Sequence, residues 1–235
     1  MSLKNWDNDT WLSSNEYIKK FNNFLLKQKK LNKDSLILDI GCGRGKILGE
    51  LNSKLRLKNK PTGLDILSHN DRDKRINFKR IDVLKFLKKD KKNYDLILIK
   101  QTIHLLNFKK IKKLILTCKT KLNHKGKIII FSLETSKNEI PTFFLMKKKL
   151  ENSFKRDKKI IRFLYKLYPR TKRKIFSFRV KITKNKYLEM IKNRYISTLL
   201  NFKSNEISKG IDEINQKFKK TLSFNDKLIC LILEK

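Results

Sequence analysis

Three glycines spaced two residues apart are the feature of this sequence with the clearest chemical consequence. Gly41, Gly43 and Gly45 directly follow the apolar run Leu36–Ile40, which contains Asp39. Glycine permits a tight turn and lets a ligand approach the backbone closely. The pattern is Asp-x-Gly-x-Gly-x-Gly, whereas a dinucleotide fingerprint would need a glycine at position 46, where this chain has lysine. The turn is therefore predicted to bind a cofactor other than NAD.

Asp65 is a second candidate for the same site. It lies near the end of the predicted strand Pro61–Ile66, 20 residues after Gly45. A carboxylate in this place can accept hydrogen bonds from both hydroxyls of a ribose. The turn and Asp65 together predict a site for a cofactor that contains a nucleoside.

The segment from Leu36 to Gly45 resembles motif I of class I S-adenosylmethionine-dependent methyltransferases, in the small-molecule group that includes types 11 and 12. In this family the turn holds the amino-acid part of the cofactor, and the resemblance implies that Asp39 serves the turn and the cofactor's cationic end. It also implies that Asp65 binds the ribose and that Asp82 lies near the adenine amino group. The full set of implied cofactor-binding residues, with Ile66 and Val83 flanking the adenine, is Asp39, Gly41, Cys42, Gly43, Gly45, Asp65, Ile66, Asp82, Val83 and Lys100.

Polar residues also follow the predicted strand Tyr94–Lys100. In similar small-molecule enzymes this strand ends beneath the transferable methyl group, and here Gln101 and His104 come next. Imidazole has a reference pKa of about 6.5, which makes His104 the candidate general base. His104 could instead only pack beside the cofactor. We expect Gln101 and His104 among the substrate-binding residues.

Short apolar runs alternate with amphipathic segments over the first 135 residues. Such runs are typical of parallel strands that helices bury on both faces. With the resemblance, they predict an α/β fold, a Rossmann-like and mostly parallel seven-stranded sheet with helices on both faces. The predicted strands of this part are residues 35–40, 61–66, 76–82, 94–100 and 127–133.

After residue 135 this alternation stops. Helical segments follow, with one extended stretch at 176–182. At the end we predict an antiparallel hairpin, with Thr221–Phe224 and Lys227–Leu233 as strands and Asn225 and Asp226 as the turn. The chain is predicted to be a single methyltransferase domain with four parts: an N-terminal helical segment over the cofactor (1–34), a cofactor-binding core (35–135), a substrate-binding helical cap inserted after strand five (136–202), and a last helix with the hairpin (203–235).

The cap and the N-terminal segment are the expected sources of further contacts. Arg194, with Ser197, could bind an anionic group of the acceptor. Trp6, Trp11 or Tyr17 is expected near the cofactor, as in similar enzymes. The aromatic residues of the cap could line an apolar pocket or form only the cap's own core, and they are Phe143, Phe144, Phe176, Phe178 and Tyr195.

The formal net charge of +37 comes from 59 lysines and arginines against 22 acids. Such a charge can indicate a polyanionic partner. However, 48 of the basic residues are lysines spread along the chain and only 11 are arginines, whereas nucleic-acid sites concentrate arginine. We interpret the charge as compositional and expect only non-specific polyanion binding at low salt.

The favoured function is methyl transfer from S-adenosylmethionine to a small molecule, with S-adenosylhomocysteine as the product. No apolar run approaches the roughly 20 residues of a membrane span, and three widely spaced cysteines favour a reduced, cytoplasmic protein without a metal site. A methyltransferase of RNA or DNA is the first alternative. Enzymes that methylate base amines commonly carry an Asn/Asp-Pro-Pro-aromatic motif after strand four, where this chain reads Lys-Gln-Thr-Ile, but ribose methylation stays open. The second alternative is a non-catalytic protein that binds S-adenosylmethionine.

Overall fold

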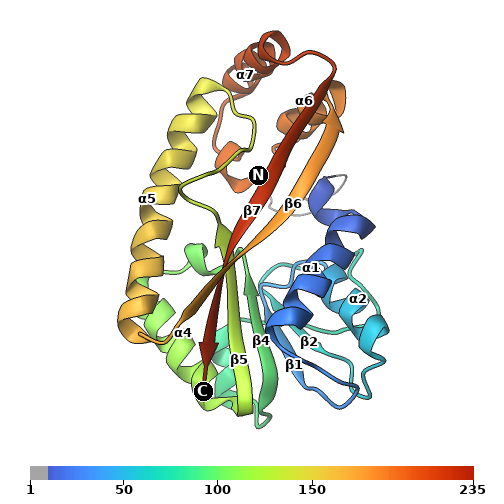
Figure 1. The fold of residues 1–235 in the computed structure, drawn as a ribbon, viewed down its shortest axis with the longest axis vertical. Helices are drawn as coiled ribbons and strands as arrows, with labels where there is room; N and C mark the ends of the chain where they lie inside the picture. Colours follow the sequence, from blue (N-terminus) through green and yellow to red (C-terminus); the bar gives the residue numbers. More distant parts are fainter. Residues whose placement is uncertain (1–9) are drawn as a thin grey trace.

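The computed structural model describes residues 10–235, which form a seven-stranded sheet with helices on both faces (Figure 1). The strand order is β3-β2-β1-β4-β5-β7-β6; β7 runs antiparallel to both of its neighbours, β5 and β6, and the other neighbouring strands in this described part are parallel. The predicted Rossmann-like sheet is confirmed. The strands are β1 Ile37–Ile40, β2 Thr62–Asp65, β3 Asn77–Arg80, β4 Tyr94–Lys100, β5 Leu122–Leu133, β6 Lys172–Thr183 and β7 Thr221–Glu234. The α-helices are α1 Asn15–Gln28, α2 Lys46–Leu55, α3 Val83–Lys89, α4 Phe108–Thr120, α5 Phe144–Leu167, α6 Lys184–Lys192 and α7 Ser204–Lys217. The 3-10 helices are η1 Trp11–Ser13, η2 Ile103–Leu105 and η3 Ser197–Leu199.

The order in which successive strands are added to the sheet reverses between β1 and β4. These strands are parallel neighbours, with Ile40 beside Ile99 near their carboxyl ends. In an open parallel sheet, ligands bind in the crevice outside the carboxyl ends of the strands at such a switch point. The glycine turn at 41–45 leaves β1 at this edge, and Lys100 ends β4 beside it. The fold therefore brings the residues predicted for the cofactor to one edge.

Strands β6 and β7 form a long twisted ribbon that continues beyond the rest of the sheet (Figure 1). β5 pairs with β7 only as far as Leu133, whereas β6 pairs with β7 along its whole length, up to Thr183. Burial alternates along the protruding half of β7 and becomes continuous where β7 enters the sheet, because only the second half has neighbours on both sides. Helices α6 and α7 and the short η3 connect the two strands beside this protruding end, and we call these three elements the cap.

The C-terminal part corrects two predictions. The predicted hairpin after residue 220 is wrong, because β7 is one continuous strand. Asn225 and Asp226, predicted as its turn, lie in mid-strand opposite Arg179 and Phe178 of β6. The cap is also connected differently from the prediction. β6 occupies residues 172–183 of the predicted insertion, so α6 and α7 follow β6, while α5 directly after β5 runs alongside the sheet.

Helix α1 packs against both the sheet and the ribbon. The ring centroids of Phe21 and Phe131 of β5 are 4.6 Å apart, and those of Tyr17 and Phe178 of β6 are 5.1 Å apart. The opposite face of the sheet is covered by α3, α4 and the last turns of α5. Across residues 10–235, the helices are all too short or too polar to span a bilayer.

Candidate active site

The glycine turn is packed so tightly that two of its glycines cannot be replaced without a clash. Its three glycines have φ values of 75, 54 and 74 degrees, in the left-handed region that favours glycine. A Cβ on Gly41 would lie 2.1 Å from Thr102 Oγ1, and one on Gly45 would lie 2.2 Å from Ile76 Cδ1. A Cβ on Gly43 would meet no atom within 4 Å. Gly43 thus borders open space, where a ligand can reach the backbone.

Asp65 holds this turn from the end of β2. Its Oδ2 accepts a hydrogen bond from Gly43 N–H at 2.9 Å, and its Oδ1 accepts one from Leu67 N–H at 3.0 Å. Each carboxylate oxygen keeps a second lone pair, so two further donors can bind. The carboxylate therefore has the capacity that two ribose hydroxyls require.

Asp39 is a buried carboxyl group whose Oδ1 has no hydrogen-bond partner in the described structure. Burial raises the pKa of Asp39 to about 7, while Lys100 lowers it and Asp65 raises it further. Lys100 Nζ donates to Gln101 Oε1 at 2.9 Å and lies 5.4 Å from the centre of the Tyr17 ring. A buried oxygen of this kind is costly unless a ligand donates to it. Asp39 thus fits the cationic amine of S-adenosylmethionine.

Apolar surface lies beside Asp65 on the side away from β1. Ile66 is 65% exposed, an unusual exposure for isoleucine, and Val83 is half-buried. Asp82 Oδ1 accepts hydrogen bonds from the first turn of α3, including one from Leu84 N–H at 3.0 Å, which leaves Oδ2 without a donor among the described residues. A flat purine ring could cover Ile66 and donate to this oxygen. The binding of the adenine by Ile66, Asp82 and Val83 stays a prediction.

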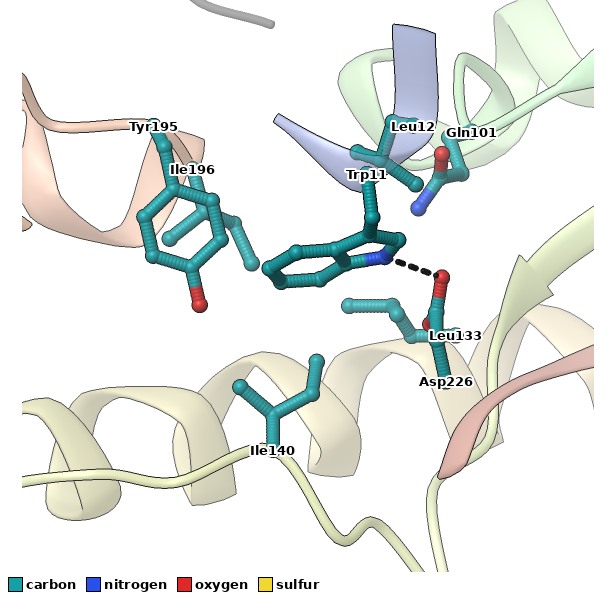
Figure 2. Close-up of a pocket in the computed structure, with 8 residues that line it drawn as sticks. All are labelled: Trp11, Leu12, Gln101, Leu133, Ile140, Tyr195, Ile196 and Asp226. Atoms are coloured by element: carbon teal, nitrogen blue, oxygen red, sulfur yellow. Dashed lines mark hydrogen bonds between the residues drawn. The ribbon is translucent and has the colours of Figure 1, made fainter. Parts of the chain in front are cut away.

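A pocket opens between the carboxyl ends of β4 and β5 and the cap (Figure 2). Gln101 follows β4 with a φ of 53 degrees, a left-handed conformation that is uncommon for a residue other than glycine. Such strain is often retained where a side chain must be aimed at a ligand. We call this pocket the Trp11–Asp226 pocket. Its lining residues are Trp11, Leu12, Gln101, Leu133, Ile140, Tyr195, Ile196 and Asp226.

Asp226 and Trp11 join the two ends of the chain across this pocket. Trp11 Nε1 donates to Asp226 Oδ2 at 2.9 Å, and the carboxylate is 1% exposed (Figure 2). Burial raises the pKa of Asp226, although the bond from Trp11 and the charge of Lys100 lower it. The Trp11 and Tyr195 rings lie 5.4 Å apart, centroid to centroid. The pocket therefore combines aromatic walls with a single buried carboxylate.

His104 and Arg194 do not line this pocket. His104 lies in η2, and burial followed by the charge of Arg156 lowers its pKa to about 4. An imidazole with this pKa is a weaker base than an ordinary histidine. Arg194 Nη2 donates to Phe202 O at 3.1 Å and so braces the cap itself. The structure thus brings Gln101 to the pocket, but neither of these two residues.

Of the aromatic residues predicted for the cap, Tyr195 is the one that lines the pocket. Phe176 and Phe178 pack edge-on against Tyr17 in the core. Phe143 packs against α7, and Phe144 is 69% exposed. Trp6 lies outside the described residues. Trp11, in contrast, lines the pocket, and its expected position near the cofactor stays a prediction.

Asp226 is the functional candidate that the sequence interpretation missed. The pair Asn225 and Asp226 is a common turn signal and by itself predicts a turn. A different pattern was present, because Leu222, Phe224, Asp226 and Leu228 alternate and are all buried. That alternation is typical of a strand with one buried face and would have placed the carboxylate inside.

No cysteine is activated as a nucleophile. Burial raises the pKa of Cys42, Cys118 and Cys230, and Asp39 and Asp65 raise that of Cys42 further. The thiolate is the reactive form of cysteine, so all three thiols are inert near neutral pH. Over the described residues, no group of three or more His, Cys, Asp and Glu side chains is placed to hold a metal ion.

Residues 38–130 match the family model of a methyltransferase domain. Solved structures share the fold at low sequence identity. A putative methyltransferase from an antibiotic biosynthesis pathway of Anabaena variabilis is 13% identical, with 90% of this chain and 96% of that chain covered and a TM-score of 0.59. The plantazolicin methyltransferase BpumL, in complex with a monoazolic desmethylPZN analogue and S-adenosylhomocysteine, is 17% identical, with 98% and 88% covered and a TM-score of 0.53.

The N-methyltransferase NodS from Bradyrhizobium japonicum, in complex with S-adenosylhomocysteine, is 14% identical, with 97% of this chain and 92% of that chain covered and a TM-score of 0.51. A comparison with curated proteins gave no significant match. The matched segment spans β1 to β5 and contains the glycine turn, Asp65 and the end of β4. Residues 38–130 therefore match the methyltransferase domain family model, and the chain shares its fold with solved methyltransferases, two of which are in complex with S-adenosylhomocysteine.

Proposed function

We propose that this enzyme transfers the methyl group of S-adenosylmethionine to a small molecule bound in the Trp11–Asp226 pocket. The observation that carries the proposal is the position of this pocket at the ends of β4 and β5, enclosed by Tyr195 and Ile196 from the cap side and by Trp11 from the N-terminal side. Small-molecule sites are concave and mostly apolar, with a few polar groups that orient the ligand. The lining described above has this composition.

The cofactor is held in this proposal by the residues of the sheet edge. Asp39 and the glycine turn bind its amino-acid part, Asp65 binds the ribose, and Ile66 and Asp82 contact the adenine. S-adenosylmethionine supplies a methyl group that is already activated for transfer to a nucleophile. The protein's main task is then to hold the acceptor in line, and such positioning can contribute roughly 7–11 kcal/mol of the barrier.

Trp11 and the cap would exclude water from the acceptor. The bond from Trp11 to Asp226 joins the N-terminal segment to β7 at this pocket. Exclusion of water strengthens electrostatic interactions inside a site. Gln101 is the polar side chain that lies both at the end of β4 and in the pocket, and we propose that it orients the acceptor.

Transfer of a labelled methyl group separates this proposal from its alternatives. The enzyme is incubated with labelled S-adenosylmethionine and either a small-metabolite extract or total RNA and DNA, in about 150 mM salt, where non-specific binding to polyanions is weakened. We expect label in the metabolite fraction and none in nucleic acid. Stoichiometric labelling of an RNA at one site would establish the nucleic-acid alternative instead, and transfer to neither fraction would favour a binding protein.

A further inference from the structure

We propose that the acceptor carries a protonatable amine and that Asp226 is the residue that recognises it. This inference rests on the proposed function, because it assigns the chemistry of the ligand in the same Trp11–Asp226 pocket. The indole N–H of Trp11 and the Tyr195 hydroxyl are two polar groups of the pocket lining. The other polar side chains of the lining are Gln101 and Asp226. Of these, only Asp226 can carry a charge.

One carboxylate oxygen of Asp226 is free to bind a ligand. Oδ2 accepts the indole N–H of Trp11, and among residues 10–235 no group donates to Oδ1. The Asp226 side chain is nonetheless only 1% exposed. A buried carboxylate with one neutral donor is poorly compensated, and a cationic donor is the partner that compensates it best.

The aromatic walls favour the same ligand. Trp11 and Tyr195 both line the pocket and lie in contact with each other, with their ring centroids 5.4 Å apart (Figure 2). The Tyr195 hydroxyl lies 3.0 Å from that of Tyr187, whose proton is donated to Pro141 O, so Tyr195 is the donor in that pair. Tyr195 therefore offers its ring and an oxygen that can accept, rather than a free proton. Aromatic faces attract cations, and the attraction increases when the cation is desolvated.

Among residues 10–235, the cation that acts on Asp226 is Lys100. Lys100 acts on Asp226 through its charge, but it also acts on Asp39, and its Nζ donates to Gln101. Tyr17 and Tyr195 are the other titratable neighbours, and Asp226 raises the pKa of each after burial has done so. Among the described residues, Lys100 is thus a cation whose charge acts on both Asp39 and Asp226.

The charge of the whole protein makes this inference easy to test. With a net charge of +37, the chain attracts anions and repels cations at long range. A preference for an amine would therefore run against the overall field and must arise in the pocket. Three probes of matched shape separate the possibilities: phenethylamine, 2-phenylethanol and phenylacetate.

Calorimetry on the full-length protein saturated with S-adenosylhomocysteine measures each probe in about 150 mM salt. We expect phenethylamine to bind at least about tenfold more tightly than either other probe, which is the scale of one charge-assisted hydrogen bond. Asp226→Asn should reduce phenethylamine to the affinity of 2-phenylethanol, because the amide removes the charge but can still accept the Trp11 bond. Asp212→Asn, which makes the same change on the exposed side of α7, should keep the preference.

Trp11→Phe separates recognition from closure of the pocket. It removes the bond to Asp226 but keeps the carboxylate, so the order of affinity among the three probes should be kept. The inference is overturned if phenethylamine binds no better than 2-phenylethanol to the wild type, including the case in which neither binds, or if Asp226→Asn retains the preference. Failure of S-adenosylhomocysteine to bind in the first step would instead contradict the cofactor assignment.

Discussion

The two halves of the proposed active site differ in how their residues come together. The cofactor half lies on the turn after β1 and on the ends of β2, β3 and β4, and its contacts join residues near one another in the chain, such as Gly43 and Asp65. The pocket half depends on Trp11 and Asp226, which are 215 residues apart. The first half can be recognised from a local motif, whereas the second exists only once the sheet has been completed by β7.

This difference predicts that substitutions in the two halves have separable effects. Changes at the turn should act on cofactor binding, and changes in the cap should act on stability and on the acceptor. The expected effects run from the loss of cofactor binding to a change in stability alone.

Gly43→Val should have the largest effect on the cofactor. A β-branched residue is strained at a φ of 54 degrees, and its side chain would fill the open space beside the turn. We expect S-adenosylhomocysteine binding to weaken by more than about 100-fold while the circular dichroism spectrum remains that of a folded protein. Gly41→Ala is the contrasting variant, because its Cβ would clash with Thr102, and it should instead lower Tm strongly. Normal binding by Gly43→Val would show that the cofactor does not lie where we place it.

Asp65→Ala should have the next largest effect. It removes the acceptor of the Gly43 N–H and the two positions assigned to the ribose. Charge-assisted hydrogen bonds contribute about 1.5–3 kcal/mol, so calorimetry should show S-adenosylhomocysteine binding weakened by roughly 10- to 150-fold. Asp71→Ala is the control, since Asp71 lies in the same loop and pairs with Arg44. Equal losses in both variants would indicate that the loop matters and the ribose contact does not.

The affinity for S-adenosylhomocysteine should rise with pH between 6 and 8. Burial raises the pKa of Asp39 to about 7, so the carboxyl group is mostly protonated at pH 6 and mostly ionised at pH 8. The ionised form binds the cofactor's ammonium group, which predicts an increase of about tenfold across this window. The charges of Lys100 and Asp65 also act on the Asp39 carboxyl group. Both residues are therefore left unchanged in this experiment. Asp39→Asn should flatten the profile, and a wild-type affinity that falls with pH would contradict the role of Asp39.

Gly210→Val should affect the cap and spare the cofactor. A Cβ on Gly210 of α7 would lie 2.6 Å from the ring of Phe143, so the helix could not keep its position. Overpacking of this kind costs typically 1–3 kcal/mol, which should appear as a lower Tm with little change in S-adenosylhomocysteine affinity. Ser208→Val introduces the same side chain on the exposed face of α7 and should be nearly neutral. A large loss of cofactor affinity in Gly210→Val would show that the two halves are coupled.

The sequence interpretation succeeded where function depends on local backbone geometry. Gly41, Gly43 and Gly45 all have the positive φ values that their spacing suggested, and Asp65 reaches the turn as the strand order requires. It failed where a residue's environment is built by distant segments. Asp226 was placed in a turn because its neighbours in sequence are polar, whereas its burial comes from Trp11 and from pairing with β6. The candidate role of His104 as a general base stays a prediction, although burial and the charge of Arg156 lower its pKa and it does not line the pocket.

A calorimetric titration of the wild-type protein with S-adenosylhomocysteine tests the central assignment most directly. The geometry of the turn predicts one site with a dissociation constant in the micromolar range, which corresponds to about 8 kcal/mol, and no binding of NAD under the same conditions. The absence of binding by S-adenosylhomocysteine, or equal binding of NAD, would contradict the account.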